Sequence, residues 1–155
     1  TLKQIESSAY TTITGPSGTT LSFIEMPGHS VRALKGSAIS LGGNFFEISV
    51  ETLHHDDTLA FWEKMGYEII YGEREGNWVT MADDFIKIGF YRKDTVPHPF
   101  HSPAITYFEN DMKGRINLLK QLGMPIAHEL GNCKTGPSDA ILETPSGYHV
   151  FLFTA

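Results

Sequence analysis

The sequence predicts an α+β fold made of two tandem βαβββ modules, preceded by an extra N-terminal β-hairpin. Two stretches carry this prediction. LAFWEKMGYEI (59–69) and INLLKQLGMPI (116–126) each place apolar residues at helical spacing, then a glycine, then an extended segment. A shift of 57 residues superposes them and, without a gap, also superposes FFEISV (45–50) on SPAITY (102–107). Such an internal repeat outweighs local patterns in a fold prediction.

Residues 1–43 are expected to form the N-terminal hairpin and a bridge to the first module. AYTTITGPSGTTLSFIEM (9–26) aligns with DAILETPSGYHVFLFTA (139–155), and both have Pro-Ser-Gly between strand-like segments. The opening therefore resembles the tail of a further module. The explanations left open are a truncated or rearranged gene, a sequence that is a fragment, a hairpin kept as an addition, and chance.

The first module is expected at 44–93 and the second at 102–155, joined by a linker at 94–101. The prolines of DTVPHPFHSP (94–103) favour a linker over a helix or strand. A lone four-stranded sheet with one helix has a second face to cover. We therefore expect the two modules to pack together as one domain.

Within each module a strand leads into a helix, and three strands follow. Helix caps are offered by Asp56, Asp57 and Thr58 in the first module and by Asn110 and Asp111 in the second. Gly66 and Gly123 stand where a helix needs a left-handed residue to end. The later strands are YEIIYG, NWVTMAD and FIKIGFYR in the first module, and MPIAHEL, SDAILET and GYHVFLFTA in the second.

Length and composition limit the classes of function. At 155 residues the chain has the size of one domain with a sizeable core. A net charge of −6 argues against nucleic acid or an anionic membrane as partner and favours a neutral or cationic ligand. No apolar run approaches the ~18 residues that span a bilayer, and no signal peptide is evident, so we expect a cytoplasmic protein. Cys133 is the single cysteine, which fits a reducing compartment.

The tandem repeat with its LAFWEKMGYEI motif resembles the vicinal oxygen chelate superfamily. That group holds glyoxalase I, extradiol dioxygenases, fosfomycin-resistance enzymes and bleomycin-resistance binding proteins. NDMKGRINLLKQLGMPI (110–126) is similar to its second-module helix, and TPSGYHVFLF (144–153) to its closing hairpin. The resemblance covers residues 44–155. It implies a curved mixed sheet around a cavity, to which each module contributes half, and it leaves the activity open.

The resemblance also implies where a metal would bind. Members that use a divalent ion take ligands from the first and last strands of each module. These positions fall on Glu47, on Ile88 or Gly89, on Ala104 and on Phe151. A catalytic ion needs about three or four nitrogen or oxygen ligands, and only Glu47 supplies one. We therefore expect no metal or other cofactor.

Two histidines stay as weak substitutes for the missing ligands. His149 shares a strand face with Phe151 by period-two alternation, and His101 stands three residues before Ala104. With Glu47 they would form the alternative site, for one Zn, Mn, Ni or Fe ion. The histidines expected in solvated or surface positions are His54, His55, His29 and His128.

Glu47 is the candidate catalytic residue. In a dry cavity its pKa would rise and it could act as a general base. A half-exposed strand carboxylate paired with a cation is the ordinary alternative. Cys133 lies beside Lys134, which would lower a thiol pKa, but a lone cysteine in a glycine-rich loop is more often merely exposed.

Aromatic residues are concentrated in the predicted strands. Where the superfamily sets metal ligands, this chain has Phe151 and small or aliphatic residues, which favours a pocket for a flat or apolar molecule. Trp78, beside the turn EREGN, is the preferred aromatic at the pocket mouth. The expected ligand-binding residues are Trp78, Phe90, Tyr107, Tyr148, His149 and Phe151.

The sequence therefore favours a metal-free module that binds a small molecule, and the expected ligand is flat, aromatic or cationic. The alternative is a metal-dependent lyase, isomerase, thiol transferase or dioxygenase that uses Glu47 with an unusual histidine. A weaker third hypothesis is a regulatory domain whose pocket has filled in. The resemblance also implies a homodimer, in which the hairpin adds an edge strand to its own sheet or to a partner.

Overall fold

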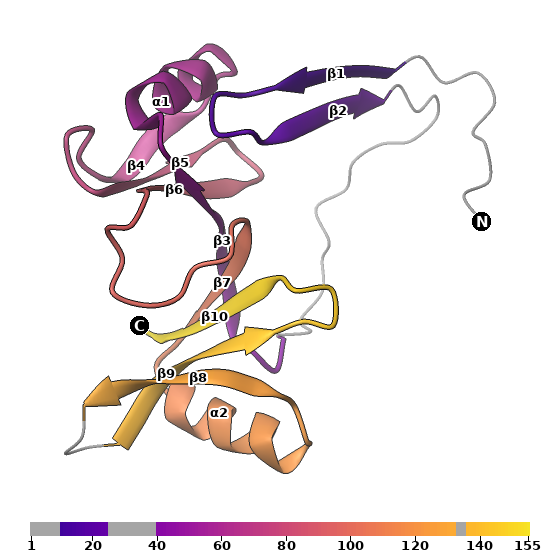
Figure 1. Ribbon diagram of the computed structural model, residues 1–155, viewed down its shortest axis with the longest axis vertical. Coiled ribbons are helices and arrows are strands. Elements are labelled where there is room, and N and C mark those ends of the chain that lie inside the picture. The colour runs from indigo at the N-terminus through magenta and orange to yellow at the C-terminus, as the bar shows by residue number, and fades with distance from the viewer. Residues whose placement is uncertain (1–9, 25–39, 133–135) are drawn as a thin grey trace.

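The computed structural model of the chain describes residues 10–24, 40–132 and 136–155. Within these ranges the chain forms one eight-stranded sheet, a separate two-stranded hairpin and two helices (Figure 1). The strand order of the large sheet is β4-β5-β6-β3-β7-β10-β9-β8. Each module supplies one contiguous half of it, with its own helix, at opposite ends of the long axis.

The elements follow the predicted order. The hairpin is β1 (Tyr10–Thr14) and β2 (Thr20–Ile24). The first module is β3 (Asn44–Thr52), α1 (His55–Lys64), β4 (Glu68–Gly72), β5 (Trp78–Ala82) and β6 (Lys87–Arg92). The second is β7 (Ala104–Glu109), α2 (Met112–Gln121), β8 (Ile126–Asn132), β9 (Gly136–Glu143) and β10 (His149–Thr154).

The sheet is mixed, and its central pairing relates the two modules. β3 pairs parallel with β6, β10 pairs parallel with β7, and β3 and β7 pair antiparallel. The central partners are Glu47 with Thr106, Ile48 with Ile105, and Ser49 with Ala104. The 57-residue shift also carries Ile48 onto Ile105, so a pseudo-two-fold axis passes between these residues. The sequence repeat is thereby confirmed as a structural repeat.

Both helices end in the same way, as predicted. Gly66 and Gly123 have φ of 91° and 76°, in the left-handed region. After α1, the amide of Gly66 bonds Glu63 O and the amide of Tyr67 bonds Trp62 O, both at 3.0 Å. After α2, the amides of Gly123 and Met124 make the equivalent bonds to Lys120 O and Leu119 O. Each pair of bonds forms a Schellman motif, which turns the chain from the helix into the next strand.

The helix starts match the prediction in one module only. Asp111 caps α2, since its Oδ1 accepts a hydrogen bond of 3.0 Å from the amide of Gly114. The first helix starts earlier than predicted, after His54, without a side-chain cap. Asp56 and Asp57 therefore lie in its first turn, where their charges favour the helix dipole.

Strand alternation separates the sheet into two faces. The helix face carries both apolar cores: α1 packs on Val50, Val79, Met81, Ile88 and Phe90, and α2 packs on Ala140, Leu142 and Leu152. Ile48 of β3 and Ile105 of β7 are paired, so their side chains lie on the same face of the sheet. Both helices therefore pack on that one face. The opposite face, which we call the open face, carries Glu47, Thr80 and Tyr91. The segment 94–103 joins β6 to β7.

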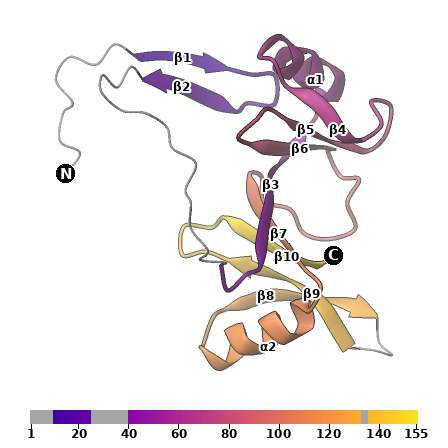
Figure 2. The same ribbon diagram turned by 180° about the vertical axis from the view of Figure 1, so that it is seen from behind.

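The N-terminal hairpin stands outside the large sheet. β1 and β2 pair only with each other among the described strands, so the expected edge strand in the chain's own sheet is not formed. The hairpin contacts α1 near its turn, where Gly15 lies against the Phe61 ring and Leu21 packs on the first core. Its other end projects away from both modules (Figure 2). Most of the expected bridge lies outside the described residues.

None of the helices in the described ranges is long and apolar enough to cross a membrane.

Candidate functional site

Glu47 lies on the open face of β3, at the centre of a cluster of hydroxyl groups. The residue is 0% exposed. Its Oε1 accepts hydrogen bonds from Ser49 Oγ (2.9 Å) and Tyr91 OH (2.7 Å), and its Oε2 accepts one from Thr80 Oγ1 (2.8 Å). Ser49 Oγ lies 2.6 Å from Thr106 Oγ1. Hydroxyls from β3, β5 and β6 therefore hold the carboxylate, and the cluster reaches across to β7.

The space for Glu47 is made by a glycine. A Cβ placed on Gly89 would collide with the Glu47 carboxyl group, so Glu47 lies where a side chain of residue 89 would otherwise be. The register also shows which residue is equivalent to Phe151. Ile88 pairs with Ile48, and Val150 pairs with Ile105, so Gly89 and Phe151 are equivalent positions in the two modules.

Burial sets the electrostatics of the cluster. Desolvation raises the pKa of Glu47, although its hydrogen bonds to Tyr91, Thr80 and Ser49 and the charge of Lys87 act to lower it. Burial and the neighbouring Glu47 raise the pKa of Tyr91. Three hydroxyls donating to one carboxyl group match its ionised form, which only accepts.

An aromatic pocket opens on the open face where the two modules meet, lined by residues of both modules and of the linker. Its volume is about 640 Å³. The lining residues are Phe46, Tyr71, Trp78, Thr80, Tyr91, Val96, Phe108, Phe153 and Ala155. Thr80 and Tyr91 are thus shared by the pocket wall and the Glu47 cluster, while Glu47 itself lies behind them. The pocket is a largely apolar chamber in which two of the three lining hydroxyls, those of Thr80 and Tyr91, are backed by a buried carboxylate.

The rings of this pocket are arranged as flat walls. Trp78 stacks on Tyr91 with ring centroids 6.5 Å apart and an interplanar angle of 23°. Phe46 meets Phe108 edge-to-face at 5.0 Å. Lys87 Nζ lies 4.7 Å from the centre of the Phe46 ring, a cation–π contact. The walls can therefore receive a flat ring, and one of them already carries a cation.

The structure divides the predicted ligand-binding residues between different places. Trp78 lines the pocket and is 44% exposed. Phe90 and Tyr107 point to the helix face instead: Phe90 packs on Trp62 and Tyr107 packs on Phe45. We therefore remove Phe90 and Tyr107 from the candidate site. Their strand positions have the opposite parity to Tyr91 and Phe108, which do line the pocket.

The second module's half of the open face is covered by the chain's own linker. Phe100 packs with Ala104, Ile141 and Phe151. The centroid of the His98 ring lies 4.8 Å from that of Phe151 and 5.4 Å from that of Phe153. Phe151, which we expected to face a ligand, is 2% exposed and contacts these linker rings. The linker thus covers part of the second module's half of the open face, beside the aromatic pocket.

His149 and His101 form a stacked pair at the edge of this covered region. Their ring centroids are 4.3 Å apart, and His149 Nδ1 accepts a hydrogen bond of 3.2 Å from the His101 amide. Burial and the nearby His101 lower the pKa of His149. One ring nitrogen of His149 is therefore occupied in holding the linker to β10.

The residues present do not fit the metal site that the resemblance implies. Of the four positions, Gly89, Ala104 and Phe151 have no donor side chain, and the Glu47 oxygens already accept hydroxyl hydrogen bonds. Within the described residues no group of three or more His, Cys, Asp or Glu side chains could hold an ion.

The other histidine and cysteine predictions have mixed outcomes. His54 and His128 are exposed, as expected. His55 is buried, contrary to expectation, because it is the first residue of α1 and not part of an exposed turn before the helix. Its ring nitrogens have no hydrogen bond within the described structure, and burial lowers its pKa. Cys133 and His29 lie outside the described residues.

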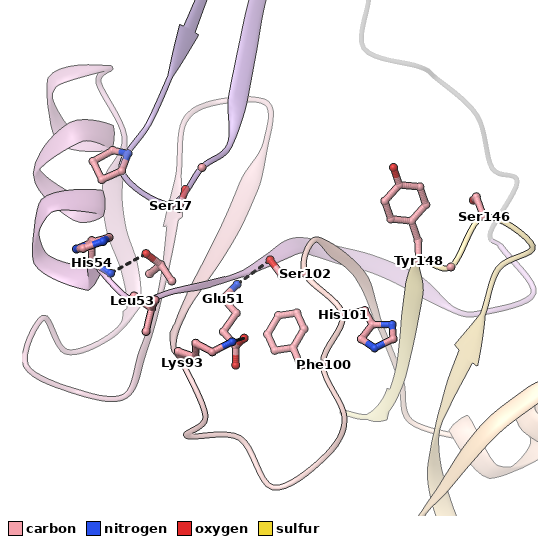
Figure 3. Close-up of a pocket in the computed structure, with 14 residues that line it drawn as sticks. Ser17, Glu51, Leu53, His54, Lys93, Phe100, His101, Ser102, Ser146 and Tyr148 are labelled. Carbon is pink, nitrogen blue, oxygen red and sulfur yellow. Dashed lines mark hydrogen bonds and ion pairs between the residues drawn. The ribbon is translucent and has the colours of Figure 1, made fainter.

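A second, larger cleft of about 770 Å³ lies between the modules and the hairpin (Figure 3). Ser17 and Ser146, from the two matching Pro-Ser-Gly turns, line it from opposite sides, beside Tyr148. Its charges are already paired: Lys93 Nζ lies 3.6 Å from Glu51 Oε2. Tyr148, a predicted ligand-binding residue, belongs to this open cleft and not to the aromatic pocket.

Sequence reasoning missed Ser49, Thr80 and Tyr91 as site residues, because hydroxyl residues on strands form no recognisable motif. Alternation was the available signal. Ser49 is two residues from Glu47, and Tyr91 is two residues from Gly89, so each pair shares the open face.

Comparison with known proteins agrees with the fold. The sequence matches no protein-family profile and no curated protein. A glyoxalase/bleomycin resistance protein/dioxygenase superfamily member from Vibrio splendidus is similar in structure, with a TM-score of 0.50 and 13% identity over 72% of this chain and 100% of that one. A Legionella pneumophila protein described as an NAD-dependent benzaldehyde dehydrogenase is also similar, with a TM-score of 0.57 and 8% identity over 69% of this chain and 96% of that one. At such identities the likeness concerns the fold alone. The chain has the vicinal oxygen chelate fold.

Proposed function

We propose that this protein binds a small, flat aromatic molecule without a metal ion. The observation that carries the proposal is the aromatic pocket on the open face, with its stacked Trp78 and Tyr91 rings. A chamber of about 640 Å³ has the size of a small-molecule site. Its lining is mostly rings, with the hydroxyls of Thr80 and Tyr91 as polar anchors.

Metal-free binding is supported by the donor chemistry of the superfamily positions. Gly89, Ala104 and Phe151 offer no ligand atoms, and the hydrogen bonds of Glu47 satisfy its carboxylate without an ion. The net charge of −6 favours a neutral or cationic guest. A cytoplasmic setting, which suits a protein with one cysteine, is part of the proposal.

Calorimetric titration with naphthalene derivatives, starting with 2-naphthamide, tests the pocket. We expect saturable binding that weakens about two- to tenfold in Trp78→Ala, since one aromatic stacking partner contributes roughly 0.5–1.5 kcal/mol. Phe85→Ala is the matched control, because Phe85 is 74% exposed and does not line the pocket. Equal weakening in both variants, or no binding to the wild type, would refute the proposal.

Metal content distinguishes this proposal from the enzymatic alternative. The purified protein is dialysed against a weak chelator, exposed to Zn, Mn, Ni or Fe, and measured by mass spectrometry. We expect no stoichiometric retention. About one ion retained per chain, and lost in Glu47→Ala, would instead support a metal-dependent enzyme that uses Glu47 with His101 or His149.

We also propose that the protein is a homodimer. An apolar strip made of Phe45, Ile48, Ile105 and Tyr148 lies on the helix face, and its members are 36–53% exposed. The strip lines a hollow of about 430 Å³ and contains the Ile48–Ile105 pair at the pseudo-two-fold axis. Exposed apolar surface of this kind is typical of protein interfaces.

A further inference from the structure

Three hydroxyl residues line the aromatic pocket, and two of them, Thr80 and Tyr91, donate their hydrogens to the same buried carboxylate; Tyr71 carries the third hydroxyl. Thr80 Oγ1 donates to Glu47 Oε2, and Tyr91 OH donates to Glu47 Oε1. A hydroxyl has one hydrogen and two acceptor lone pairs. With the hydrogens of Thr80 and Tyr91 directed at Glu47, these oxygens keep only lone pairs for a ligand.

The other two hydroxyls of the cluster also direct their hydrogens toward the carboxylate side. Ser49 Oγ donates to Glu47 Oε1, so its single hydrogen is used. The 2.6 Å contact between Ser49 Oγ and Thr106 Oγ1 must then be donated by Thr106. Four hydroxyls on four strands are therefore oriented by one carboxylate, which makes this orientation costly to reverse.

We propose that Glu47 makes the side of the pocket formed by Thr80 and Tyr91 accept hydrogen bonds only, so that this side selects aromatic ligands bearing N–H donors and a positive charge, such as an aryl amidinium. This inference rests on the proposed function and names the chemistry of its ligand. Glu47 acts through Thr80 and Tyr91 and is a positioning residue for specificity. An anionic or acceptor-only group would meet lone pairs backed by a negative charge.

The surroundings of the pocket agree with this selection. Lys87 Nζ already lies on the Phe46 ring, so a pocket wall accepts a cation. Lys87 also offsets part of the Glu47 charge, which weakens the long-range attraction for a cation. It leaves the hydroxyl orientation unchanged, because the hydrogen bonds to Glu47 are direct. The donor preference is therefore expected to exceed the preference for charge alone.

Calorimetric titration with one ring system and five substituents tests the inference. The probes are 2-naphthamidine, 2-naphthamide, methyl 2-naphthoate, 2-naphthoate and a trimethylammonium naphthalene, which carries charge without a donor. We expect 2-naphthamidine to bind at least tenfold more tightly than methyl 2-naphthoate, as one charge-assisted hydrogen bond supplies that factor. 2-Naphthoate should bind most weakly, and the trimethylammonium probe should fall below the amidine.

Three variants separate the role of Glu47 from general damage to the protein. In Glu47→Gln the new amide donates to one hydroxyl and frees its hydrogen, so the preference for amidine over ester should fall at least tenfold. Tyr91→Phe keeps a ring at the wall and removes one acceptor, so it should weaken the amidine and spare the ester. Thr52→Val is the matched control, because Thr52 is a buried hydroxyl residue of β3 that bonds Thr58 on the helix face.

The outcomes distinguish this inference from the proposed function. Binding of all five probes with similar affinity, or an unchanged preference in Glu47→Gln, would overturn the inference while the aromatic pocket stood. Tightest binding of ester or carboxylate would overturn it as well. No binding of any probe would remove the proposed function and the inference together. Thermal unfolding of each variant shows that it is folded before it is titrated.

Discussion

At the scale of single residues, the most unusual feature is an ionisable side chain buried among neutral hydroxyls. Glu47 has Ser49, Thr80 and Tyr91 as its hydrogen-bond partners. Such groups satisfy a carboxylate without cancelling its charge, so part of its desolvation cost persists in the folded state. A buried charge that destabilises the fold in this way is typical of residues kept for function and not for stability.

The raised pKa of Glu47 predicts how stability depends on pH. A carboxyl group whose folded pKa is raised binds its proton more tightly in the folded state. Its stabilising contribution is complete below its unfolded pKa of about 4.3 and is lost as pH rises through the folded pKa. The wild type should therefore lose stability relative to Glu47→Gln as the pH rises from about 4.3 through the folded pKa of Glu47.

Urea unfolding of both proteins across that range measures this difference. Groups such as His55 and His149, whose pKa values are lowered, reduce stability at acidic pH in both proteins and cancel in the comparison. A difference in unfolding free energy that stays constant with pH would show that Glu47 has the same pKa folded and unfolded.

At the scale of elements, the two modules use the same device to leave a helix and enter a strand. Gly66 and Gly123 both adopt positive φ, and the bonds around them repeat atom for atom. No described atom lies within 4 Å of a Cβ built on either glycine, so conformation, and not space, requires glycine there.

Alanine at either glycine should therefore destabilise the protein by a predictable amount. Gly66→Ala and Gly123→Ala should each cost roughly 1–2 kcal/mol, the penalty of a left-handed residue that has a Cβ. Gly123→Asn should cost less, because asparagine tolerates this conformation. Unfolding free energies from urea titration check both expectations, and equal costs for Ala and Asn would point to a cause other than φ.

The linker is the element whose role was least visible beforehand. Its prolines predicted a simple connection, yet Phe100 and His98 pack into the second module's half of the open face. One wall of the aromatic pocket also includes Val96 from this segment. The linker therefore shapes the site as well as joining the modules.

At the scale of the whole molecule, the exposed apolar strip lies at the centre of the helix face, where the pseudo-two-fold axis passes. The first helix packs mainly on β5 and β6 and the second on β9 and β10, and the middle of the sheet, at Ile48 and Ile105, stays partly exposed. A second copy packed there would bury both residues.

We expect Ile105→Lys to convert a dimer into a monomer, because it places a charge in the proposed interface. Light scattering at tens of micromolar measures the mass. Leu53→Lys is the control, since Leu53 is 76% exposed and lies outside the strip. A monomeric wild type, or a dimer that survives Ile105→Lys, would count against an interface at this strip.

The sequence alone determined the repeat, the module order and both helix ends, because these depend on periodicity and on glycine at left-handed positions. The same periodicity predicted Trp78 at a strand start, and the structure places this residue in the pocket lining. The sequence predicted the strands that hold Phe90 and Tyr107 but not the face of the sheet that each side chain occupies. Both lie on the helix face, and the next residues along the chain, Tyr91 and Phe108, line the pocket. A strand's face depends on which neighbours it pairs with, and those neighbours are distant in sequence.

Tertiary structure alone decided that Glu47 is fully buried, that Gly89 makes its space, that three hydroxyls donate to it and that a fourth, from Thr106, contacts Ser49. These facts require contacts between β3, β5, β6 and β7, which no local pattern encodes. The linker's cover over Phe151 likewise comes from packing between segments about fifty residues apart. Local physics sets which elements form, and the chemistry of the site is set where those elements meet.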